Sequence, residues 1–263
     1  MKYFDSHAHY YDDRFFEEIE GSTEEFIGAL LSSDVSYIVN VGTSPETCRR
    51  AINQAKAFQN MYTALGIHPS DCQHLTVTEE AALADIEALI RDKSNKCVAL
   101  GEIGLDYHYP DTDKEKQLLY FEEQMKLAEK LCIPVVIHDR EAHEDVLSVI
   151  RKFPSVKGVL HSFSGSAEMA KEVVKLGYKV SFSGTLTFTN ARKPKEAAAA
   201  IPIEHILIET DSPYLAPHPK RGSLNHSGNL SYINSTLAAI KGLSEDDCAR
   251  ITEENALNFF GLK

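Results

Sequence analysis

The chain has 263 residues, of which 43% are hydrophobic and 25% charged, values typical of a globular protein with a large core. Its 39 acidic and 27 basic residues give a net charge of −12, which excludes a surface that tracks long nucleic-acid duplexes. Any contact with nucleic acid must therefore be local.

The sequence contains neither a membrane span of ~18 apolar residues nor a basic-then-apolar signal at its start. The five cysteines are scattered without a C-x-x-C pair, which argues against a disulfide framework and a thiolate metal site. We expect a cytoplasmic, monomeric protein without membrane contact.

Predicted strands and helices alternate along the chain. The strands are short apolar or β-branched runs at residues 4–9, 37–42, 62–69, 97–102, 133–138, 158–161, 178–183 and 206–211. The helices follow capping or proline signals, or carry apolar residues at helical spacing. They are predicted at residues 23–31, from 45, from about 78, around 118–128, and at 141–150, 167–176, 232–240 and 246–259.

Eight strands alternating with helices over this length predict a closed (β/α)8 TIM barrel, formed by residues 1–263 as one domain. An open doubly wound sheet that binds a dinucleotide is the alternative. It is disfavoured because no Gly-x-Gly-x-x-Gly follows the first strand.

Potential metal ligands end several of these strands. His7 and His9 are spaced i, i+2 on the first strand, so their rings point to the same face. Later strands end in Glu102, His138, His161 and Asp211. TIM barrels build active sites at this end of their strands. For each residue alone a buried or solvated polar role is an equal alternative, but together they favour a metal site.

The donor set predicts two divalent ions with Glu102 between them. His7, His9 and Asp211 would bind one ion, and His138 and His161 would bind the other. Such a pair lowers the pKa of a water molecule and polarises a scissile phosphoryl or carbonyl oxygen, which predicts a hydrolase. Imidazole and carboxylate ligands suit Zn²⁺, Mn²⁺, Co²⁺ or Mg²⁺ and do not select among them.

These residues belong to a set of motifs that spans the chain. The motifs are DSHAH (5–9), GIHP (66–69), GEIGLDY (101–107), VIH (136–138), HSFSG (161–165) and ETDSP (209–213). Through them the chain resembles the TatD family of metal-dependent deoxyribonucleases in the amidohydrolase superfamily. The resemblance implies a TIM barrel, divalent metals and hydrolysis of DNA phosphodiesters, typically from the 3′ end. D-aminoacyl-tRNA deacylation is another activity attributed to the family.

The resemblance also implies that Asp211 is catalytic, because its counterpart accepts a proton from the nucleophilic water. The resemblance implies that His68 contacts a phosphate of the substrate. An equal alternative is that His68 forms a hydrogen bond with one of the metal ligands. Arg221 on the last loop could also grip a phosphate, or be a solvated charge. Glu209 is expected to be buried and hydrogen-bonded. Asp106 is expected to orient a ligand or cap a loop.

One segment departs from the family pattern. Family members usually carry Asn-Glu-Pro shortly after the loop arginine, whereas here Asn225 is followed by His226 and Ser227. The metal ligands are unaffected. The departure concerns the rim loop and the substrate preference that it sets.

Three functions remain open at this point. The leading interpretation is a 3′–5′ exonuclease-type deoxyribonuclease that acts on DNA ends or single-stranded DNA. The second is a metal-dependent ester or amide hydrolase, such as a D-aminoacyl-tRNA deacylase, because both chemistries use the same fold and metals. The third is a metal-binding module without turnover, which the complete ligand set disfavours.

Overall fold

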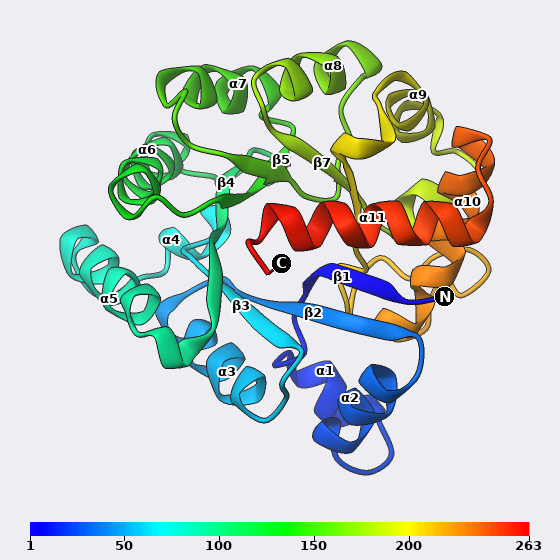
Figure 1. Cartoon of the computed structure of the whole chain (residues 1–263). Coiled ribbons are helices and arrows are strands. Elements are labelled where there is room, and N and C mark those ends of the chain that lie inside the picture. The colour runs from blue at the N-terminus through cyan, green and yellow to red at the C-terminus, as the bar shows by residue number, and fades with distance from the viewer. Residues whose placement is uncertain (263) are drawn as a thin grey trace.

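Parallel strands form the centre of the computed structural model, which describes residues 1–262 (Figure 1). Within that range eight strands pair in the order in which they follow along the chain. They are β1 (Tyr3–Ala8), β2 (Val35–Gly42), β3 (Met61–Leu65), β4 (Cys97–Asp106), β5 (Val135–Arg140), β6 (Gly158–Leu160), β7 (Lys179–Phe182) and β8 (Ile206–Ile208). Sequential parallel pairing with intervening helices defines a (β/α)8 barrel, and the predicted TIM-barrel fold is confirmed.

A short contact between β8 and β1 closes the barrel. Ala8 forms an isolated parallel bridge with Ser212. The Asp211 amide donates to the His7 carbonyl at 2.9 Å, and the His9 amide donates to the Ser212 carbonyl at 2.7 Å. Closure of the sheet therefore brings together three of the predicted metal ligands.

Helices surround this barrel. The longer helices are α2 (Thr23–Ser32), α3 (Pro45–Lys56), α5 (Glu79–Arg91), α6 (Lys114–Leu131), α7 (His143–Lys152), α8 (Ala167–Lys175), α9 (Arg192–Ala200), α10 (Leu230–Lys241) and α11 (Glu245–Phe259). The shorter ones are α1 (Asp13–Glu18) and α4 (Pro69–Cys72). Serine caps begin α2 and α3 where the sequence predicts, and Pro45 occupies the first turn of α3. None of the helices described over residues 1–262 is long and apolar enough to cross a membrane.

The interior of the barrel is apolar at the N-terminal ends of the strands. A buried cluster takes members from seven strands: Phe4, Val39, Val41, Ala64, Val98, Ala99, Val136, Val159 and Leu207. Helix α11 lies across this end of the barrel (Figure 1), and Ala256 and Phe260 join the cluster from it and its C-terminal cap. The Phe260 ring stacks on Phe4 with their centroids 5.6 Å apart. The helix closes one end of the barrel, and the opposite end carries the polar site.

Strands β4 and β5 extend beyond their predicted ends. β4 and β5 pair as far as Asp106 and Arg140, so Glu102 and His138 lie inside strands rather than at their ends. Gly104 permits this pairing, because it has a φ of +134° and a Cβ there would stand 2.1 Å from the His138 carbonyl oxygen.

β3 is shorter than predicted, because it ends at Leu65 and His68 lies beyond it as the N-cap of α4. β6 and β8 are also shorter than predicted. They end at Leu160 and Ile208, so His161 and Asp211 follow their strands rather than end them. Ser162 and Asp211 have φ values of 41° and 56°, which take the backbone out of the extended region. These turns direct the side chains inward over the barrel.

Candidate metal centre

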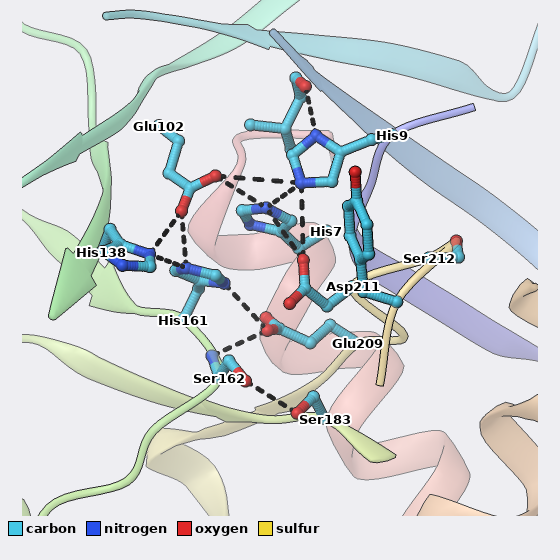
Figure 2. A network of polar contacts seen from close by, with 12 residues as sticks. His7, His9, Glu102, His138, His161, Ser162, Ser183, Glu209, Asp211 and Ser212 are labelled. Carbon is cyan, nitrogen blue, oxygen red and sulfur yellow. Dashed lines mark hydrogen bonds and ion pairs between the residues drawn. The ribbon is translucent and has the colours of Figure 1, made fainter. Parts of the chain in front are cut away.

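The six predicted ligands surround one point at the C-terminal end of the barrel (Figure 2). Glu102 lies in the middle of the group and is almost completely buried. Its Oε2 atom is 3.3 Å from His7 Nε2, and its Oε1 atom is 2.8 Å from His138 Nδ1 and 2.7 Å from His161 Nε2. The carboxylate therefore contacts residues of both predicted ligand sets.

Each predicted ligand set is compact. His7 Nε2 and His9 Nε2 are 3.0 Å apart, and Asp211 Oδ1 is 3.4 Å from His9 Nε2 and 3.8 Å from His7 Nε2. In the other set, His138 Nδ1 is 3.1 Å from His161 Nε2. Atoms at these separations can share a single ion.

In three of the imidazole rings, the nitrogen that points away from the centre (the outer nitrogen) has a hydrogen-bond partner. This partner determines whether the nitrogen that points toward the centre is free to bind a metal ion. His9 Nδ1 is 2.7 Å from the Val41 carbonyl oxygen, which only accepts, so the proton lies on Nδ1. The outer atom of His161 faces Glu209 Oε1 at 3.2 Å, and that of His138 faces Asp106 Oδ2 at 3.3 Å. A hydrogen bond of this kind fixes the tautomer and directs the other nitrogen's lone pair to the centre.

The resulting centre attracts positive charge. Burial lowers the pKa of His161, but the carboxylates of Glu102 and Glu209 outweigh burial and hold this pKa well above its usual value. Burial likewise raises the pKa of Glu102, yet His161, His68 and His7 hold it well below its usual range. Lone pairs and ionised carboxylates that converge in this way fit divalent cations.

Glu209 and Asp106 take the supporting roles expected of them. Glu209 is 1% exposed and accepts hydrogen bonds from the Ser162 amide at 2.7 Å and from His161. Asp106 accepts from the His108 amide at 3.0 Å and contacts His138, so it both caps a loop and orients a ligand.

His68 lies beside the second ligand set as a donor. Its Nδ1 accepts a hydrogen bond from the Ser70 amide at the start of α4, at 3.1 Å. A neutral ring that accepts through Nδ1 carries its proton on Nε2, which lies 3.4 Å from Glu102 Oε1. His68 Nε2 is close enough to Glu102 and His138 to share an ion, but a protonated nitrogen cannot ligate one.

A buried hydrogen-bond network around Asp5 connects the first strand of the barrel to the segment after the last strand, behind the ligands. Asp5 accepts from the amide and hydroxyl of Thr210 at 2.9 and 2.6 Å, and from the hydroxyl of Ser227 at 2.7 Å. Burial raises the pKa of Asp5 to about 6, although these hydrogen bonds lower it. Asn225 donates to the carbonyls of Thr210 and Tyr214 at 2.8 and 2.6 Å. The segment that departs from the family pattern therefore supports the ligand-bearing loop directly.

A cavity of about 840 Å³ opens from the centre. Five predicted ligands line it: His9, Glu102, His138, His161 and Asp211. His68 also lines it, together with Tyr11, Arg50 and Tyr214, which no sequence motif indicates. Tyr214 follows Asp211 by three residues on the proline-rich loop, and this proximity is the one sequence signal for it.

Arg221 lies apart from this cavity. Its guanidinium carbon is 4.4 Å from the centroid of the Phe188 ring, and the residue does not belong to the lining described over residues 1–262. A contact between Arg221 and substrate phosphate stays a prediction.

A TIM barrel whose C-terminal end gathers imidazoles and carboxylates around one cavity is the architecture of a metal-dependent hydrolase. The chain belongs to the TatD family, since the model described as TatD related DNase matches residues 4–261. The predicted family resemblance is confirmed.

Individual relatives agree with this assignment. YabD of Bacillus subtilis strain 168, named an uncharacterized metal-dependent hydrolase, is 37% identical over 98% of this chain and 99% of its own length. YcfH of Escherichia coli K12, described in the same words, is 31% identical over 98% of this chain and 95% of its own. The crystal structure of YjjV, a TatD homologue from Escherichia coli K12, has a TM-score of 0.90 at 28% identity and covers 99% of this chain and 98% of its own. The chain is a metal-dependent hydrolase of this family.

Proposed function

We propose that the protein is a deoxyribonuclease that removes nucleotides from the ends of single-stranded DNA, as a 3′–5′ exonuclease. The observation that carries this proposal is the position of Glu102 between two sets of ligand atoms. Two divalent ions held by these residues would activate a water molecule and stabilise the attacking and leaving oxygens of a phosphodiester. The family description as TatD related DNases supports the same chemistry.

Asp211 is the proposed proton acceptor. Its side chain is 14% exposed, so it can meet a water molecule in the cavity that it lines. Burial raises the pKa of Asp211, but the hydrogen bond with His9 and the nearby imidazoles hold it below its usual value. Asp211 is therefore ionised at neutral pH and can take a proton as general base.

His68 is the proposed contact to the scissile phosphate. The Ser70 amide fixes the proton of the neutral ring on Nε2, beside Glu102 and within the cavity. An N–H donor at that position can bind a non-bridging phosphate oxygen. The role assigned to His68 is to hold the substrate, while Asp211 moves the proton.

One observation favours a second candidate function. Four carboxylates that are not among the predicted ligands also line the cavity: Asp12, Asp13, Glu46 and Asp71. They would attract an ammonium group, which the acyl part of an aminoacyl ester carries. Hydrolysis of D-aminoacyl-tRNA is therefore the alternative, with the same ligand residues.

A substrate panel separates the two candidates. Single-stranded oligonucleotides labelled at the 3′ or 5′ end, carboxyl esters and D-aminoacyl-tRNA would each be tested with Mg²⁺, Mn²⁺ or Zn²⁺. We expect mononucleotides to be released stepwise from the 3′ end of DNA. Release of amino acid from D-aminoacyl-tRNA with intact oligonucleotides would assign the alternative instead.

A further inference from the structure

We infer that the part of the cavity beside the metal centre is a subsite for one terminal nucleoside with a free hydroxyl, and that Tyr214 is the surface on which its base stacks. This inference rests on the proposed function and specifies which part of the substrate the cavity holds.

The cavity has the size of a small-molecule site and includes the metal centre together with a neighbouring region. Its volume of about 840 Å³ falls in the ~300–1,000 Å³ range of pockets that hold a single small ligand. From the ligands it extends over the start of α3 and over the chain that follows α4, where Leu75 and Val77 line it. A space of this kind accommodates one nucleoside next to the scissile bond.

Tyr214 offers a flat, fixed surface in this cavity. The side chain is 46% exposed, and its ring centroid is 6.4 Å from that of the ligand His9. Its hydroxyl donates to Asp12 Oδ2 at 2.6 Å, and its carbonyl accepts from Asn225 at 2.6 Å. The Arg14 guanidinium carbon lies 6.0 Å from the ring centroid. An aromatic ring held in this way suits stacking of any base, because every base has a π-face.

The charge of the lining selects against a terminal phosphate. The carboxylates in this region are those of Asp12, Asp13, Glu46 and Asp71. Arg50 also lines the cavity, but its guanidinium is paired with Asp13 and the Tyr11 carbonyl, each at 2.5 Å. This pair adds no net charge, so the repulsion comes from Asp12, Glu46 and Asp71. At the start of α3, Ser44 and Thr47 satisfy each other's amides in a capping box. A phosphate placed here would face carboxylates, whereas an uncharged nucleoside would not.

Three single-stranded oligonucleotides test the inference. They differ only at the end that the protein digests, which carries an intact nucleoside, an abasic residue or a terminal phosphate. For the wild type, removal of the base should lower kcat/KM about 5- to 150-fold, the range that base–aromatic stacking supplies. The terminal phosphate should lower it about tenfold or more.

Variants of Tyr214 assign the base effect to this ring. Tyr214→Ala should cut the intact oligonucleotide about as slowly as the wild type cuts the abasic one, with no further loss when the base is removed. Tyr214→Phe retains the ring and should keep the dependence on the base. Tyr109→Ala is the matched control, because Tyr109 is 52% exposed and lies outside the described cavity lining.

Two results would overturn the subsite while leaving an exonuclease in place. One is equal cutting of the intact and abasic ends by the wild type, and the other is an undiminished base dependence in Tyr214→Ala. Equal cutting of phosphate and hydroxyl ends would overturn the selection by charge. If the wild type digests no oligonucleotide with any of the metals, the proposed function fails and the subsite fails with it.

Discussion

At the residue scale, the imidazoles of the centre differ in the hydrogen-bond partner of the ring nitrogen that points away from the centre. In His161 and His138 this nitrogen contacts a carboxylate, and in His9 it contacts a backbone carbonyl. The Nδ1 atom of His7 is buried without a hydrogen-bond partner among residues 1–262. A carboxylate raises the basicity of a ligand more than a neutral acceptor does. We therefore expect the set formed by His138 and His161 to bind its ion more tightly than the other set.

Glu209→Gln tests whether the carboxylate behind His161 strengthens metal binding. The change keeps the shape of the side chain but removes the charge behind His161, so affinity for one ion should fall about 10- to 100-fold. Metal content after dialysis against graded chelator measures the effect without reference to activity. Glu254→Gln on α11 is the control, because that carboxylate is 49% exposed and lies on the helix that closes the opposite end of the barrel. Unchanged affinity for both ions in Glu209→Gln would remove this role.

Asp211→Asn tests the general base. The variant keeps one acceptor oxygen but loses the basicity, so turnover at saturating metal should fall about 10²- to 10⁴-fold. His7→Ala should behave differently, because excess metal can refill a weakened site but cannot replace a lost base. Turnover of Asp211→Asn within a few-fold of wild type would leave Asp211 as a replaceable ligand.

Residue types and spacing were sufficient to predict the six-residue cluster. The sequence indicates His7 and His9 by their i, i+2 spacing, and the other four residues because each ends an apolar run that is predicted as a strand. Tyr214 could not be predicted, because an aromatic residue after a strand is as compatible with packing as with substrate contact. The sequence also leaves the Ser70 amide that fixes the tautomer of His68 undetected, since this depends on a short turn.

At the element scale, the sequence predicts all eight strands and the helices with a cap or a clear apolar stripe, but not the helices that are very short or weakly patterned. The sequence does not predict helices α1 and α4, because they have six and four residues, too few to show a helical repeat. The sequence does not predict helix α9, because Ala191 provides no side-chain cap and the alanines of RKPKEAAAA form no stripe of larger apolar residues. The extension of β4 past Glu102 depends on close pairing at Gly104, which is a tertiary contact.

Phe260→Ala tests whether α11 stabilises the closed end of the barrel without affecting the metal centre at the other end. Phe260 is 5% exposed and stacks on Phe4 inside the barrel, so its truncation should lower the free energy of unfolding by about 3–5 kcal/mol. Turnover per folded molecule should stay unchanged, because the cluster and the metal centre occupy opposite ends. Urea unfolding and turnover of the same preparation measure both quantities. A large loss of turnover in folded protein would contradict this separation.

At the scale of the whole molecule, the net charge of −12 restricts which DNA can approach. A duplex or a long strand would bring many phosphates against a negative surface, whereas a strand end brings few. The positive charge that metal ions supply would be confined to the cavity. The protein should therefore act at ends and not along a chain.

Closed circular single strands test this restriction. We expect linear single-stranded DNA to be digested to mononucleotides while a circle of the same sequence stays intact. Product lengths over time distinguish the two modes of cleavage. Mid-strand cuts in the circle at the rate found for linear DNA would defeat the exonuclease assignment.

The central claim is that two divalent ions, held around Glu102, make this chain a hydrolase of DNA ends. The most direct test is a titration of metal-free protein with Mn²⁺ while mononucleotide release from a linear single strand is measured. Release should be absent without metal, rise as ions are added and level off at two equivalents per chain. Full turnover in the metal-free protein, or no release at any metal concentration, would contradict the account.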